Sequence, residues 1–247
     1  MATVQESDGA KLLTWKTFER CVAIYHDKVV KRELSNDELI HRPNGAIIFP
    51  FWAKERLQNE AATLEFVAKN SSIPVPKCRL YTENGLLHLE TEKVTDGVIL
   101  DEIEEASREA AVAAVAEQME SDILPQLRSL RRNFIGSVDP NIPVFPPQRV
   151  YRLDRRSWER ITSEADDFAL IHNDLGPQNI FICPKTFRIV SIVDWEFAGF
   201  FPDYYELPLW TTFGPIKRNK LCEGAFEREL GFFGLAESDL KNYIPPP

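Results

Sequence analysis

"HNDLGPQNI" at residues 172–180 and "IVDWE" at residues 192–196 decide how this chain is interpreted. Both segments place acids or an amide beside apolar runs that predict buried strands. An unpaired charge next to a buried strand is costly, so a bound partner must offset that cost.

The polar residues of these two segments have a spacing that suits a metal and a reacting hydroxyl. Asp174 and Asn179 are five residues apart on a predicted loop, and Asp194 follows 15 residues later. The segments between them predict a hairpin that turns at residues 184–186, and both ends of a hairpin open on one side. Asn179 and Asp194 therefore converge, and two oxygen donors with room for waters suit Mg²⁺. Asp174 stays free to accept a hydrogen bond from an attacking hydroxyl.

The first hundred residues predict strands, one helix, and more strands. Residues 1–20 show no firm period, whereas residues 21–34 predict a hairpin that carries Lys31 on its second strand. Residues 51–70 predict an amphipathic helix with Glu60 at the border of its apolar face. That face consists of Leu57, Ala61, Leu64 and Val67. A second hairpin is expected around the turn at residues 83–85.

From about Asp101 onward the composition shifts toward helix. Residues 104–132 are rich in alanine, glutamate and leucine, which favour helix. Residues 152–164 and 220–233 are predicted to be helical as well. The proline-rich residues 142–148 are expected to be irregular.

Composition excludes several classes of function. The net charge of −9 over 247 residues argues against binding to nucleic acid or to anionic lipid, since both require clustered Lys and Arg. No stretch approaches the roughly 18 apolar residues of a membrane span. The first residues lack the basic start and apolar run of a secretory signal, so the expected compartment is the cytoplasm. No oligomeric state is indicated.

The pattern H-x-D-x-x-x-x-N, then a hydrophobic strand, then D, resembles the kinase catalytic loop and its metal-binding Asp. Three further segments, "NEAATLEFVAKNSSIPVPK", "LRSLRRNFIGSVD" and "DWEFAGFFPDYYE", extend this likeness. Over roughly residues 28–210 the chain resembles the aminoglycoside phosphotransferase and choline-kinase-like superfamily of small-molecule kinases, in particular its fungal aminoglycoside-phosphotransferase-like branch.

The resemblance implies an α+β, bilobal, protein-kinase-like fold. Residues 1–94 would form a small nucleotide-binding lobe with a β-sheet and one main helix. Residues 95–247 would form a larger, mostly helical lobe with the catalytic loop and the metal site. The implied reaction is transfer of the γ-phosphoryl group of ATP, with Mg²⁺, to a hydroxyl of a small molecule.

The resemblance also implies roles for single residues in the first lobe. Lys31 matches the strand lysine that touches the α and β phosphates, with Lys28 as a rival position. Glu60 matches the helix glutamate that pairs with this lysine. Glu92 to Val94 match the hinge whose backbone holds adenine.

In the second lobe, Asp174 matches the catalytic base that orients the hydroxyl, and Asn179 and Asp194 match the metal ligands. His172 matches a supporting loop histidine, and we interpret it as a structural, hydrogen-bonded residue. The aromatic run at residues 197–205 predicts core packing, with an ammonium-binding site near its acids as the alternative.

Two rival functions stay open. No glycine-rich phosphate loop precedes the hairpin at residues 21–34, which favours a pseudokinase that serves as a binding module. The other rival is a kinase-fold relative that performs non-phosphoryl chemistry on a small metabolite. The presence of Lys31, Asp174, Asn179 and Asp194 favours the kinase.

Overall fold

An antiparallel sheet forms the first part of the chain in the computed structural model, which describes residues 11–240. Its five strands lie in the order β1-β2-β3-β5-β4. Their bounds are β1 Leu13–Lys16, β2 Cys21–Ile24, β3 Lys28–Arg32, β4 Cys78–Glu83 and β5 Leu86–Glu92. Both predicted hairpins are confirmed, because β2 pairs with β3 and β4 pairs with β5.

Strand β1 was not foreseen, since residues 1–20 show no firm period in the sequence. Its four side chains are all exposed, so no alternation of buried and exposed positions marks it. The strand is held by its pairing with β2 instead. Residues 1–10 of that segment lie outside the described residues.

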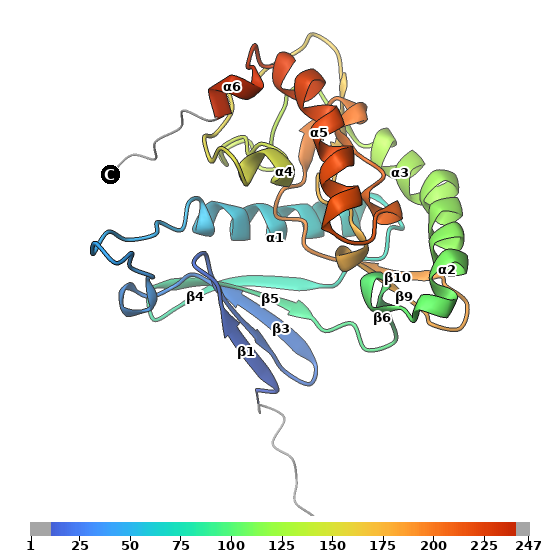
Figure 1. Cartoon of the computed structure of the whole chain (residues 1–247), viewed down its shortest axis with the longest axis horizontal. Coiled ribbons are helices and arrows are strands. Elements are labelled where there is room, and N and C mark those ends of the chain that lie inside the picture. Colours follow the sequence, from blue (N-terminus) through green and yellow to red (C-terminus); the bar gives the residue numbers. More distant parts are fainter. Residues whose placement is uncertain (1–10, 241–247) are drawn as a thin grey trace, which may run out of the picture.

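Helix α1, Ala53–Asn70, lies between the sheet and the rest of the molecule (Figure 1). Its predicted apolar face is confirmed, and the face is shared by two cores. Leu57 and Ala61 pack against residues of β5, whereas Leu64 and Val67 join the large core of the second part. The helix therefore fixes the sheet against the helical region.

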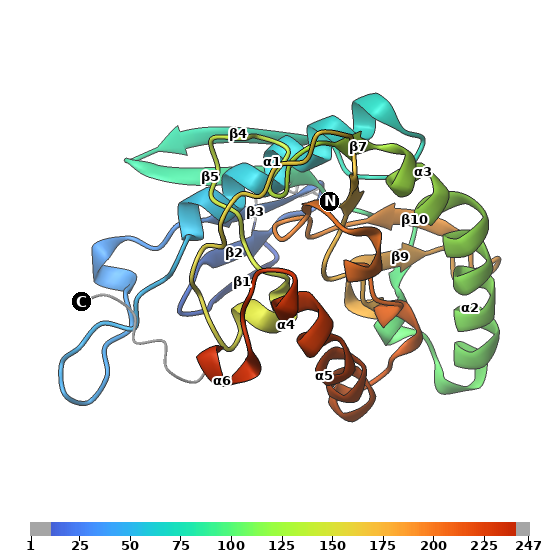
Figure 2. The same ribbon diagram turned by 90° about the horizontal axis from the view of Figure 1, so that it is seen from above.

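The second part of the chain is mostly helical and carries two small sheets. Its helices are α2 Glu105–Gln118, α3 Leu124–Ser129, α4 Gln148–Tyr151, α5 Pro215–Gly231 and α6 Glu237–Leu240. One sheet has the order β10-β9-β6, the other β11-β8-β7. The strands are β6 Val98–Ile99, β7 Arg131–Arg132, β8 Phe168–Ile171, β9 Ile180–Ile182, β10 Ile189–Ile192 and β11 Gly199–Phe201. Helices α2 and α3 lie beside β9 and β10 (Figure 2).

The predicted α+β, protein-kinase-like fold is thus confirmed, with one local correction. Residues 152–164 were expected to be helical, but helix α4 ends at Tyr151 and the following segment is irregular. Trp158 instead forms an isolated β-bridge with Val144, and Thr162 forms one with Phe134. Tertiary pairing overrides a weak local propensity here. The lobe division at residues 94 and 95 stays a prediction.

No helix within residues 11–240 is long and apolar enough to cross a membrane.

Candidate active site

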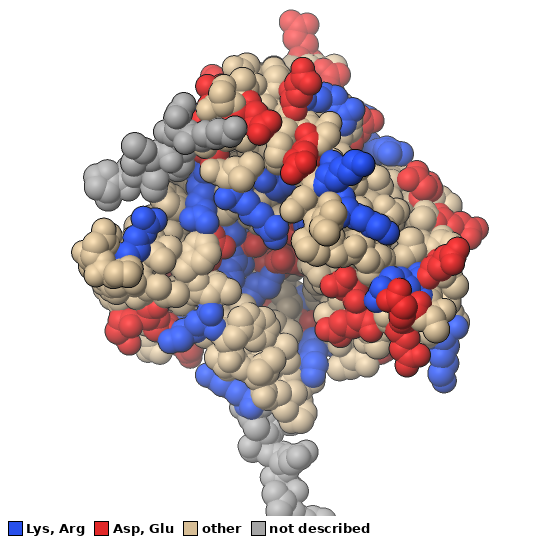
Figure 3. Space-filling view, viewed as in Figure 1, with Lys and Arg blue, Asp and Glu red and all other residues tan. Residues whose placement is uncertain are grey.

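A cavity of about 580 Å³, here called the cleft, lies where the sheet meets the second part of the chain. The space-filling view shows a hollow in the middle of this face, with acidic and basic side chains in its walls (Figure 3). Six predicted site residues line the cleft: Lys31, Glu60, Glu92, Val94, Asn179 and Asp194. Residues from five separate stretches of sequence therefore meet at one cavity.

Lys31 lies at the centre of the charged wall of the cleft. Its Nζ donates to Glu60 Oε1 at 2.7 Å and to Asp194 Oδ1 at 2.6 Å. Burial alone would lower the pKa of Lys31, but the two carboxylates outweigh it and raise that pKa. The rival Lys28 donates to Glu90 at 3.0 Å and does not line the cleft, so the structure distinguishes the two lysines.

The catalytic-loop pattern follows strand β8 directly. His172 is fully buried, its Nε2 lies 2.9 Å from the Val193 carbonyl, and its Nδ1 accepts from the Asp174 amide at 3.3 Å. Burial lowers the pKa of His172 to about 4, so the ring is neutral near pH 7 and Nε2 carries the proton. Its position agrees with the predicted structural role.

Asn173 gives the loop its bend. It adopts a left-handed backbone with φ of +66°, which asparagine tolerates better than most residues. Its side-chain amide donates to the Phe197 carbonyl at 3.0 Å. The bend and this anchor together set the direction of Asp174.

Asp174 is buried and bound from both sides. The Asn179 Nδ2 donates to its backbone carbonyl at 2.8 Å and to Oδ2 at 3.2 Å, and the Arg218 guanidinium contacts Oδ1. Burial raises the pKa of Asp174 to about 6, although Arg218 opposes the shift. Asp174 does not line the cleft itself, but Asn179 joins it to the cleft wall.

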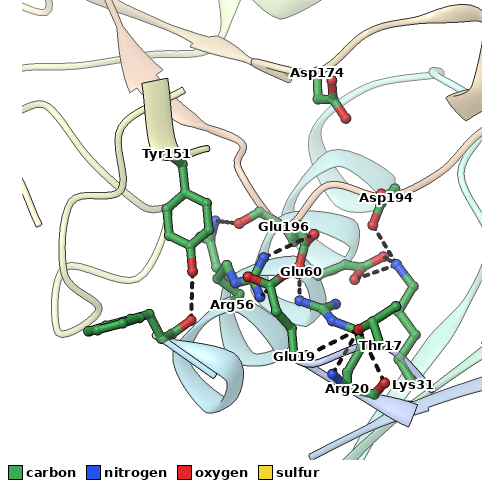
Figure 4. A network of polar contacts seen from close by, with 12 residues as sticks. Thr17, Glu19, Arg20, Lys31, Arg56, Glu60, Tyr151, Asp174, Asp194 and Glu196 are labelled. Carbon is green, nitrogen blue, oxygen red and sulfur yellow. Dashed lines mark hydrogen bonds and ion pairs between the residues drawn. The ribbon is translucent and has the colours of Figure 1, made fainter. Parts of the chain in front are cut away.

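Asp194 follows the end of β10 in a left-handed conformation, with φ of +65°. A non-glycine residue held in this region is uncommon and costs free energy, so the surroundings must impose it. Burial would raise the pKa of Asp194, but Lys31 lowers it to about 2, which leaves the carboxylate ionised at neutral pH. Figure 4 shows the carboxylate of Asp174 pointing toward the side of the cleft where Asp194 and Lys31 lie.

The donor set of the cleft fits a hard divalent cation. Asp194 offers an ionised carboxylate, and Asn179 offers its amide oxygen, because its amide nitrogen is already engaged by Asp174. Ligand oxygens of Glu60, Asp194 and Glu196 also lie within 4.8 Å of one another. Oxygen donors of this kind are the ones that Mg²⁺ prefers.

Sequence reasoning missed a largely buried charged network beside the cleft. Arg20 contacts Glu196, whose Oε1 also accepts from Arg56 at 3.4 Å, while Arg56 pairs with Glu19 at 3.0 Å (Figure 4). Arg56 is only 1% exposed, and the ring of Tyr151 lies 4.9 Å from its guanidinium carbon. No local signal marked the network, because only Glu19 and Arg20 are adjacent in sequence, whereas Arg56 and Glu196 lie far along the chain.

The turn between β1 and β2 occupies the place where a phosphate loop would precede the hairpin. In this turn the Thr17 hydroxyl accepts hydrogen bonds from the amides of Glu19 and Arg20, at 3.1 and 3.2 Å. These amides are therefore engaged within the turn. Arg20 itself lines the cleft and brings a positive charge to the wall that also carries Lys31.

A buried ion pair supports the catalytic loop from behind. Arg149 of α4 donates to Glu229 of α5 at 2.9 Å, and Glu229 is fully buried. The same guanidinium donates to the carbonyls of Asn173, at 3.3 Å, and Tyr205, at 2.8 Å. Arg149 thus ties the residue before Asp174 to two helices.

The fold and the lysine, acid and amide constellation define a kinase-like phosphotransferase. The chain belongs to the phosphotransferase enzyme family, whose model matches residues 26–237. It is accordingly a nucleotide-using phosphotransferase. The predicted superfamily is confirmed, while the fungal branch stays a prediction.

Solved structures with a similar fold are aminoglycoside phosphotransferases. The enzyme APH(3'')-Id from Streptomyces rimosus, in complex with ADP and streptomycin, is 16% identical with a TM-score of 0.49, over 90% of this chain and 86% of that one. Aminoglycoside-3'-phosphotransferase of type VIII is 18% identical with a TM-score of 0.45, over 96% and 89%. No curated protein matches the sequence.

Proposed function

We propose that this enzyme transfers the γ-phosphoryl group of ATP to a hydroxyl of a small molecule in a Mg²⁺-dependent reaction. One observation carries the proposal: Lys31, Glu60, Asn179 and Asp194 line one cavity, and Asp174 is hydrogen-bonded to Asn179 at its edge. Such sites act mainly by positioning and by neutralising charge.

In the proposed reaction one bond to phosphorus forms, one breaks, and one proton is transferred. The acceptor hydroxyl oxygen bonds to the γ-phosphorus, the bond from that phosphorus to the bridging oxygen breaks, and ADP leaves. The hydroxyl proton passes to Asp174, whose raised pKa of about 6 suits a general base near neutral pH. A Mg²⁺ ion held by Asn179 and Asp194 would neutralise phosphate charge.

The nucleotide would lie along the cleft from the hinge to Lys31. Two hinge amides are engaged, since Glu92 donates to the Lys77 carbonyl and Lys93 to the Asp27 carbonyl, each at 2.9 Å. The adenine contact is therefore assigned to Val94, which also lines the cleft. Lys31, held by Glu60, would meet the α and β phosphates. Arg20, paired with Glu196, would lie on the same wall of the cleft, where the described chain has no glycine-rich loop to offer its amides.

The test combines nucleotide binding with turnover. Mg²⁺-ATP should raise the melting temperature of the full chain by mass action, and a panel of hydroxyl compounds should reveal one that stimulates ADP release. Asp174→Ala should abolish turnover while it leaves the thermal response to ATP intact. ATP binding without turnover on any compound favours the pseudokinase, and consumption of an acceptor without ADP release favours non-phosphoryl chemistry.

A further inference from the structure

A second, smaller cavity of about 200 Å³ lies between α4 and α5, and we call it the arginine pocket. Three of its lining residues are arginines: Arg149 and Arg152 at α4, and Arg218 on α5. The Arg218 guanidinium also contacts the Asp174 carboxylate, so the pocket adjoins the proposed base. Its volume is below the roughly 300–1,000 Å³ of drug-sized sites, so it suits one small polar group.

The three arginines differ in how their charge is compensated. Arg149 is paired with the buried Glu229, and Arg218 is paired with Asp174. Arg152 is exposed and has no carboxylate within ion-pair distance among residues 11–240, and the Gln148 side-chain amide, oriented with its oxygen toward the guanidinium, accepts from Nη2 at 2.7 Å. Glu223 is the only acid among the described lining residues, and Glu229 and Asp174 compensate Arg149 and Arg218, so Arg152 is the guanidinium of the pocket without a carboxylate partner.

We infer that the acceptor of this kinase is an anion, and that its carboxylate or phosphate group binds in the arginine pocket while its hydroxyl faces Asp174. Guanidinium groups match such oxyanions in shape and charge, often through two parallel hydrogen bonds. The inference rests on the proposed function and names the substrate class of the same site. A cationic acceptor would instead meet the guanidinium of Arg152, which no carboxylate of the described residues compensates.

The alternative ammonium site in the aromatic run is occupied in part by the protein's own groups. The Tyr204 ring is covered by the Arg228 guanidinium, 4.3 Å from the ring centre. The Glu206 carboxylate accepts a hydrogen bond from the His172 amide. Tyr205 is fully buried and its hydroxyl donates to the Glu229 carbonyl at 2.6 Å. The other Glu206 oxygen, Oε1, has no hydrogen-bond partner among the described residues, so the ammonium site stays a prediction.

The test uses the full chain saturated with Mg²⁺-ADP, at constant ionic strength because salt screens such contacts. Glucuronate and glucose 6-phosphate, one carrying a carboxylate and the other a phosphate, are compared with neutral glucose and cationic glucosamine. We expect at least one of the two anions to raise the melting temperature, and glucose and glucosamine to leave it unchanged. Arg152→Glu should remove the response to the anion and keep the response to ADP.

Lys220→Gln removes a cation from α5 outside the pocket, so its responses should match those of the wild type. In turnover assays with an anionic acceptor, Arg152→Gln should raise the acceptor KM at least tenfold and leave the ATP KM within twofold. The inference is overturned if neither anion stabilises the protein, if glucosamine stabilises it equally, or if Arg152→Glu keeps the anion response. If an anion raises the melting temperature and ADP does not, the proposed function is overturned, whereas anion binding in the arginine pocket is supported.

Discussion

Replacement of Arg149 by methionine should destabilise the protein and slow turnover at the same time. The change leaves Glu229, which is fully buried, without its partner, and it frees the carbonyls of Asn173 and Tyr205. Breaking one side of a buried ion pair costs about 3–5 kcal/mol. For a chain of this size, about 2–4 °C in melting temperature corresponds to each kcal/mol, so the melting temperature should fall by roughly 6–20 °C.

A double-mutant cycle separates the free energy of the Arg149–Glu229 interaction from the packing that each side chain loses when it is replaced. The single variants Arg149→Met and Glu229→Leu are compared with the double variant by urea unfolding at pH 7, followed by tryptophan fluorescence. The double variant should be more stable than the sum of the single losses predicts, because no isolated charge stays buried in it. Single losses below about 1 kcal/mol, or strictly additive losses, would refute the reasoning.

Four further predictions concern the site. Asp174→Asn should lower kcat by about 100- to 10,000-fold and leave nucleotide affinity unchanged. Lys31→Met should weaken ATP binding about 10- to 100-fold, since it removes a charge-assisted contact worth about 1.5–3 kcal/mol. Burial raises the Glu206 pKa from 4.5 to about 7, so the folded state binds this proton more tightly and stability should fall as pH rises between these values, by at most about 3 kcal/mol. Glu206→Gln should remove that loss and be more stable than the wild type at pH 8. Chelation of divalent cations should stop turnover, and added Mg²⁺ should restore it.

Each of these outcomes has a direct check. Turnover is followed by ADP release, and nucleotide affinity by thermal shift or calorimetry. Lys28→Met is the matched control for Lys31→Met, because Lys28 lies on the same strand but outside the cleft. A near-normal kcat in Asp174→Asn would contradict the role of Asp174 as the base, and equal ATP affinities in the two lysine variants would contradict the role of Lys31. An unchanged dependence of stability on pH in Glu206→Gln would contradict the Glu206 prediction. Turnover in excess chelator would contradict the need for a divalent cation.

Sequence analysis predicted the parts of the protein whose signal is local. The two β-branched runs of residues 21–34, separated by a short break at His26 and Asp27, predict the β2–β3 hairpin. The three- and four-residue steps around Leu57 predict the buried face of α1. Strand β1 was missed because all its side chains are exposed, and it exists only through pairing with β2. The helix expected at residues 152–164 was wrong because Trp158 pairs with Val144.

By itself the sequence predicted which residues gather at the cleft: the acid and amide spacings come from the catalytic-loop segments, and the strand lysine and helix glutamate from the resemblance. Only the tertiary structure decided which charges meet: Arg20 and Glu196 are 176 residues apart, and Arg218 and Asp174 are 44 residues apart. Backbone periodicity repeats over a few residues and leaves a pattern in the chain. Long-range ion pairs have no period, because the packing of distant helices and strands brings their partners together.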